Sequence, residues 1–106
     1  MTEAKEWYDR VIDEQNELCA KIKKLKEALE SKEFADSVGE KNVILLKGQI
    51  CHMIRYALIL DVRLEGAGKE RLLYSYVPQP DIDRILDSYP LDVEKYNWKN
   101  RPNDLG

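Results

Sequence analysis

The feature that most constrains this chain is a stripe of mainly apolar residues near its N-terminus. The stripe recurs at alternating spacings of four and three residues, which is the a and d pattern of a helix that packs along another helix. Neither glycine nor proline interrupts the chain before Ser31, so we expect a helix capped by Thr2 and about 40 Å long. Such a helix needs a partner to cover its stripe. The stripe consists of Ala4, Tyr8, Val11, Gln15, Leu18, Ile22, Leu25 and Leu29.

A second long helix is predicted after a short connection. Ser31 can cap a turn that carries Phe34. Ser37-Val38-Gly39-Glu40 has the form of a capping box, which predicts a helix start near Val38. This helix should end at Gly66-Ala67-Gly68. Its apolar stripe comprises Leu46, Ile50, Met53, Ala57, Leu60 and Leu64.

Residues 69–106 follow a different pattern. The apolar and aromatic run from Leu72 to Val77 could form a final helical turn or a short strand. Pro80 suits the first turn of a short helix that ends near Ser88, and the tail from Leu91 is predicted to be extended or partly disordered. We therefore predict an all-α fold: an antiparallel helical hairpin over residues 1–68, with an extension over 69–106 that holds a short helix and the tail.

Composition excludes several classes of partner. The formal net charge is −3, so no overall field would draw the chain to long nucleic acid or to an anionic membrane. No segment approaches the ~18 apolar residues of a membrane span, and the N-terminus does not resemble a signal peptide. The sequence thus predicts a protein that stays in the cytoplasm where it is made.

Residues that could carry catalysis or bind a metal are few. His52 is the only histidine, and it falls within the second predicted helix without a catalytic set around it. Cys19 and Cys51 lie in helical patterns without ligand spacing, which favours buried thiols. We predict neither enzymatic activity nor a metal or cofactor.

Charge along the first helix suggests a binding site. Acidic residues fill its first half, whereas the second half holds lysines. One interpretation is a solvated face that matches the helix dipole. The other is a phosphate site, with Trp7 or Tyr8 as a stacking surface for a base. Because Tyr8 and Lys23 are roughly 22 Å apart on one helix, a second subunit would have to bring them together. The lysines are Lys21, Lys23, Lys24 and Lys26.

Residues 7–64 resemble the family of small phage proteins related to a crAss-phage protein, a group that includes the anti-CBASS sponge proteins. The similarity is carried by helical spacing and by a few polar markers. The extension from Glu65 to Gly106 departs from the shorter members of that family. The matching positions are Arg10-Val11-Ile12-Asp13-Glu14, Leu18, Lys21-Ile22-Lys23-Lys24-Leu25, Phe34, Leu45-Leu46, Gln49, Met53, Tyr56, Ile59-Leu60 and Arg63-Leu64.

The resemblance implies a homo-oligomer, a hexamer in that family, that sequesters cyclic di- or trinucleotide signals of bacterial anti-phage defence in the host cytoplasm. It implies that a base stacks on Tyr8 and that Lys23 holds a phosphate, with Trp7 and Lys24 as neighbours that could take these roles. Arg63 matches the arginine of a second type of pocket. The sequence leaves open which nucleotide is bound, and a related signal such as a cyclic ADP-ribose isomer is an alternative ligand.

A different class of function also fits the sequence. The helical seam or the Tyr- and Trp-containing tail, with Tyr96 and Trp98, could grip a host or phage protein. Deletion of the tail separates this interaction module from a nucleotide sponge, because a pocket in the helical hairpin does not need the tail.

Overall fold

The computed structural model describes residues 6–90, and the regular structure of this part of the chain is entirely helical. The all-α prediction is confirmed. The helices are α1 (Trp7–Leu29), α2 (Lys32–Val38), α3 (Glu40–Gly66), α4 (Leu73–Tyr76) and α5 (Gln79–Ser88).

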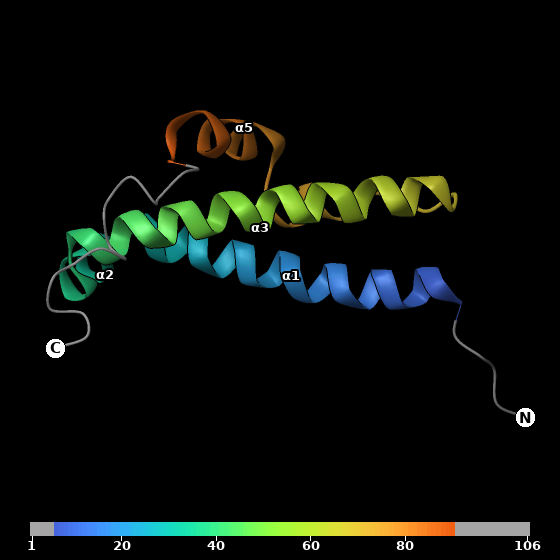
Figure 1. The fold of residues 1–106 in the computed structure, drawn as a ribbon, viewed down its shortest axis with the longest axis horizontal. Coiled ribbons are helices and arrows are strands. Elements are labelled where there is room, and N and C mark those ends of the chain that lie inside the picture. Colours follow the sequence, from blue (N-terminus) through green and yellow to red (C-terminus); the bar gives the residue numbers. More distant parts are fainter. Residues whose placement is uncertain (1–5, 91–106) are drawn as a thin grey trace, which may run out of the picture.

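The two long helices, α1 and α3, lie side by side along most of their length and run in opposite directions (Figure 1). The N-terminal end of α1 is held by Asp9, whose carboxylate accepts a hydrogen bond of 3.2 Å from the backbone N–H of Glu6. The predicted cap, Thr2, lies outside the described residues. The apolar stripe of α1 faces α3: Val11, Gln15 and Ile22 are buried there.

The connection between the long helices is itself a helix, and not the short turn that we expected. Ser31 does cap it, because its hydroxyl accepts a hydrogen bond of 3.2 Å from the N–H of Phe34. The predicted capping box is wrong: Ser37 donates its hydroxyl proton to the carbonyl of Phe34, within α2. Gly39, with φ of +89°, then separates α2 from α3. That left-handed conformation suits glycine, so the chain can redirect there without a side-chain cap.

Helix α3 is the longest element, with 27 residues, and it ends at Gly66 as predicted. By length and composition it is apolar enough to cross a membrane, the single such helix in the described part of the chain. Our expectation that no segment comes near this limit is therefore wrong. One helix of this kind is weak evidence for a membrane span, since core helices of soluble proteins meet the same criterion, and α3 buries Ile54, Ala57 and Leu60 inside the fold.

The extension supplies two further helices, which share a core with α1 and α3. The run from Leu72 to Val77, for which a strand was an alternative, forms the single turn α4. Pro80 lies in the first turn of α5, which ends at Ser88 as predicted. α3 is thus covered on a second side, and its buried surface is wider than the one stripe read from the sequence. The core cluster includes Cys19, Ile22, Ile50, Cys51, Ile54, Ala57, Leu73, Val77, Ile82 and Ile85.

Both cysteines lie in this core as free, buried thiols. Burial, together with the negative charge of Asp61, raises the pKa of Cys19 to about 12. Burial also raises the pKa of Cys51, against the opposing effect of Arg55. Because a thiol must lose its proton to act as a nucleophile, these side chains serve packing and not reaction chemistry at neutral pH.

Candidate functional site

The five predicted site residues lie in two separate places on the folded chain. Trp7 and Tyr8 occupy the first turn of α1, and Arg63 lies beside them in the last turns of α3. Lys23 and Lys24 lie in the second half of α1. The structure therefore brings three of these residues together at one end of the helix pair and the other two in a groove further along α1.

The first place is an aromatic–cation cluster formed by Trp7, Tyr8, Arg63 and Lys69. The two rings meet edge to face, with centroids 5.8 Å apart. The Arg63 guanidinium lies 5.8 Å from the centre of the Trp7 ring, and the Lys69 ammonium lies 4.5 Å from the centre of the Tyr8 ring. Each ring thus has a cation at its face. Trp7 is 49% exposed, so a ligand can reach this cluster.

The rings of the cluster are supported from beneath. Tyr8 is half-buried and packs against Val11, Leu60 and Leu64, which form a small core of their own. This packing orients the ring, so the Tyr8 side chain would lose little conformational entropy when a flat ligand stacks against it. Stacked bases and their phosphates need an aromatic face and a nearby cation, and the cluster offers two of each.

The second place is a lysine groove of about 490 Å³ along α1. Within residues 6–90, Lys21, Lys23 and Lys24 form no ion pair, so their ammonium groups are open to a ligand. Lys26 differs, because it pairs with Glu30 at 3.1 Å and with Asp81 at 3.4 Å. The lining residues are Glu17, Ala20, Lys21, Lys23, Lys24, Glu27 and Tyr76.

Tyr76 is the member of the groove that sequence reasoning missed. It comes from α4, and its hydroxyl donates a hydrogen bond of 2.7 Å to the side-chain oxygen of Asn16 on α1. The ring is thereby fixed beside the lysines. No pattern within α1 could reveal it, because it lies 60 positions from Asn16 in the sequence.

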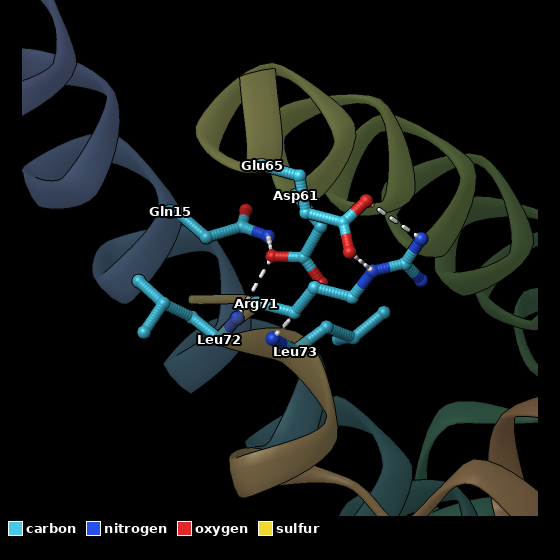
Figure 2. A network of polar contacts seen from close by, with 6 residues as sticks. All are labelled: Gln15, Asp61, Glu65, Arg71, Leu72 and Leu73. Atoms are coloured by element: carbon cyan, nitrogen blue, oxygen red, sulfur yellow. Dashed lines mark hydrogen bonds and ion pairs between the residues drawn. The ribbon is translucent and has the colours of Figure 1, made fainter. Parts of the chain in front are cut away.

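The position of α4, and hence of Tyr76, depends on the buried carboxylate of Asp61 (Figure 2). Asp61 accepts hydrogen bonds from the backbone N–H groups of Leu72 at 2.9 Å and Leu73 at 3.2 Å. It also accepts one of 2.8 Å from the side-chain amide of Gln15. Buried charge is stable only when it is well hydrogen-bonded, so these three donors fasten α4 to both long helices.

An exposed ion pair reinforces the same join. Arg71 donates to both carboxylate oxygens of Glu65, at 2.8 and 3.0 Å. The pair holds the pKa of Glu65 below its usual range through the hydrogen bond from Arg71. Figure 2 shows it next to the Asp61 contacts, at the point where the chain turns from α3 into α4. The loop after α3 is thus tied down on two sides.

Two further hollows lie at the corner of α2 and α3. Their volumes are about 260 and 440 Å³, and both are lined by Glu40 and Ile44. Among residues 6–90, neither has an aromatic side chain in its lining. Within that part of the chain, they therefore offer no ring for a flat ligand to stack on, whereas the aromatic–cation cluster and the lysine groove do.

Comparison with known proteins decides the family. The profile of the Sequestin family matches residues 5–66, more than half of the chain. This protein belongs to the Sequestin family. The Sequestin match covers α1, α2 and α3, and with them all five predicted site residues. It leaves out Lys69 of the aromatic–cation cluster and Tyr76 of the lysine groove.

Searches of curated proteins and of solved structures found no match to this Sequestin chain. The family name itself indicates a sequestering role.

Proposed function

We propose that this protein binds a cyclic di- or trinucleotide signal of bacterial anti-phage defence and withholds it from its effector without cleaving it. The observation that carries the proposal is the pairing of an aromatic–cation cluster with a groove of three lysines that form no ion pair within residues 6–90, on a chain of the Sequestin family. A cyclic oligonucleotide presents both partners that these sites suit: flat bases and closely spaced phosphates. A cyclic ADP-ribose isomer shares this chemistry.

Each part of such a ligand has a matching surface. A base would stack on Tyr8 or Trp7, which costs little entropy because the rings are already oriented. Arg63 and Lys69 lie at the ring faces, so they would turn toward the phosphates as a base takes their place. Lys23 and Lys24 would hold a phosphate as point charges. No step in this scheme needs a nucleophile, a metal or a cofactor.

The two places would be joined by self-association. The point midway between Tyr8 and Lys23 on α1 lies next to Asn16. A two-fold axis that crosses α1 at this point would place Tyr8 of one copy near Lys23 of the other copy, and the dimer would contain this pair twice. Tyr56 marks the same level on α3, since its hydroxyl donates a hydrogen bond to the Glu14 carboxylate. From Tyr56 toward the end of α3, three large apolar side chains are exposed: Tyr56 at 44%, Ile59 at 58% and Val62 at 57%.

These side chains form an exposed apolar patch on α3, of the kind that marks protein interfaces. We propose that it is covered by another copy of the chain, in an oligomer that the family resemblance implies to be a hexamer. We further propose that the protein acts in the host cytoplasm, because the signals are made there and their binding requires neither a membrane nor long nucleic acid.

The test that separates sequestration from catalysis is recovery of the ligand. Cyclic oligonucleotides would be incubated with an excess of the protein, the protein would then be heat-denatured, and the released nucleotide would be analysed by chromatography. Sequestration predicts that the free ligand disappears before denaturation and is recovered intact afterwards. A linear or hydrolysed product would show an enzyme instead.

A further inference from the structure

We propose that Tyr76, from the extension outside the Sequestin match, is the base-stacking wall of the lysine groove, and that the groove selects nucleotides whose bases carry an exocyclic amino group. The inference rests on the proposed function for the identity of the ligand as a cyclic nucleotide. Tyr76 would be a binding residue outside residues 5–66, which the family profile matches, and the lining of the groove would determine which bases fit.

Tyr76 and three lysines face the same hollow of the molecule. Tyr76 lines the same groove as Lys21, Lys23 and Lys24. Its hydroxyl is bound to Asn16 at 2.7 Å, and the helix that carries it is held through Asp61. The ring is therefore a fixed wall next to three open cations. This is the arrangement of an aromatic face and a phosphate-binding charge that stacking sites use.

The floor of the groove supports this assignment. Ala20 lies on α1 between Glu17 and Lys24, on the helix face that the spacing of three and four residues defines. Its short side chain leaves the volume of about 490 Å³ open, which lies within the range of ligand pockets. A larger residue there would fill the space beside the Tyr76 ring without changing any charge.

Two acidic side chains also line the groove. Glu17 and Glu27 line the groove with the three lysines, so the lining carries a net charge of only about +1 if all five groups are ionised. Bare phosphate would gain little from such a site. A nucleotide would gain from both charges, because lysines take the phosphates while a carboxylate accepts hydrogen bonds from an amino group on adenine, guanine or cytosine. Uracil offers no such group.

The test is calorimetric titration of the full chain with cyclic di-AMP, cyclic di-GMP and cyclic di-UMP at one salt concentration. The structure predicts binding of the first two and at least ~10-fold weaker binding of cyclic di-UMP. Tyr76→Leu should weaken binding by about 10-fold or more, in line with the loss of one stacked base. Tyr76→Phe keeps the ring and should stay within about 3-fold of the parent.

Two variants keep the result independent of folding. Ala20→Leu is at an exposed helix position, so it should fold normally and still abolish binding in the groove. Tyr74→Leu is the matched control, because Tyr74 is also on α4 but packs against the main core and does not line the groove. It should bind as the parent does.

The outcomes separate the two proposals. If cyclic dinucleotides bind, Tyr8→Ala loses them, and both Tyr76→Leu and Ala20→Leu bind as the parent, the Tyr76 inference is wrong and the proposed function stands. If no cyclic nucleotide binds, the proposed function fails, and the groove is then probed with ADP by following the NMR signal of the Ala20 methyl group. A saturating shift of this NMR signal that Tyr76→Leu weakens would support Tyr76 as the stacking wall of the groove. A signal that does not move with ADP would overturn that assignment.

Discussion

Gln15 and Asp61 lie 46 positions apart in the sequence, yet the Gln15 side-chain amide donates a hydrogen bond of 2.8 Å to the Asp61 carboxylate inside the protein. The same amide group donates to the carbonyl of Ala57 at 2.7 Å. Both residues are fully buried. This contact sets the register of α1 against α3, and through Leu72 and Leu73 it sets the start of α4.

Substitution of Asp61 should test this join. Asp61→Asn keeps the shape but turns one acceptor into an NH₂ donor, which would face the N–H of Leu73 or an equivalent donor. We expect a loss of ~1 to 3 kcal/mol in the free energy of unfolding, the cost of a buried unpaired donor. Denaturation in urea, followed by circular dichroism, measures it.

Gln15→Met is the matched comparison for Asp61→Asn. The Gln15 side-chain carbonyl oxygen has no hydrogen-bond partner among the described residues. Removing this unpaired buried acceptor regains its desolvation cost, which offsets part of the stability lost with the two hydrogen bonds of the amide N–H₂ group. Gln15→Met should therefore cost less than Asp61→Asn. A larger cost for Gln15→Met would mean that Asp61 is not the centre of the network.

Stability should fall at alkaline pH because of Cys19. Its pKa is about 12 in the folded protein, against an ordinary value of 9.0. Below about pH 9 the Cys19 thiol is protonated in both the folded and the unfolded chain, and its contribution to stability is fully present. At higher pH the unfolded chain loses this proton first, which lowers the free energy of unfolding until the folded thiol ionises as well. The free energy of unfolding should fall by as much as ~1.4 kcal/mol per pH unit between about pH 9 and 12.

The measurement for Cys19 is urea denaturation at several pH values, compared with Cys19→Ala. The variant is expected to be less stable overall because of its cavity, but to show a shallower decline above pH 9. Iodoacetamide should label the native parent slowly and the unfolded chain quickly. Equal slopes and fast native labelling would show that the thiol is not held neutral by the fold.

The exposed apolar patch should control assembly. Ile59→Lys together with Val62→Lys places charge where another copy is proposed to pack, so the variant should sediment as a smaller species than the parent with unchanged helicity. Ser37→Lys adds charge on the exposed face of α2 and should leave the assembly intact. A parent that is monomeric at all concentrations would contradict the proposed oligomer.

Phosphate binding by lysine should depend on salt. Lys23→Gln should weaken cyclic nucleotide binding and should also flatten the decrease of affinity with ionic strength. Lys32→Gln removes an equally charged but distant side chain, one that pairs with Asp36. It should behave as the parent does. If the two variants bind alike, Lys23 does not contact the phosphates.

Deletion of residues 91–106 separates the sponge from the interaction module. These residues, which include Tyr96 and Trp98, lie outside the part of the chain that the structure describes. A sponge whose pocket lies on α1, α3 and α4 should keep its ligand affinity after the deletion. Full loss of ligand binding, or ligand-independent capture of a protein that needs the tail, would favour the interaction module.

The long helices were predictable because their signals are local. The spacing of residues such as Val11 and Ile22 defines a helix face without any knowledge of its partner, and Gly66 marks a helix end. The connection was harder. Ser37 and Glu40 match a capping box in sequence, but the positive φ of Gly39 lets α2 end and α3 begin without it.

The site was only partly predictable, since its remaining members come from the extension. Lys69 reaches the Tyr8 ring from beyond the end of α3. Tyr76 reaches the lysine groove only because Asp61 positions α4. One signal was present: Asp61 interrupts the apolar stripe of α3 between Leu60 and Leu64, and an acid at a core position indicates a buried partner.

The most direct test of the account is a thermal-shift and calorimetric screen of the intact protein against cyclic di- and trinucleotides and cyclic ADP-ribose isomers, with Tyr8→Ala and Lys23→Ala alongside. A ligand at ~100 times its dissociation constant adds about 2.7 kcal/mol of stability. We predict a clear shift with one ligand class that both variants reduce, by ~1 to 3 kcal/mol of binding energy for the lost stacking ring. No shift with any of these ligands, at concentrations that saturate a micromolar site, would contradict the sequestration of cyclic nucleotides.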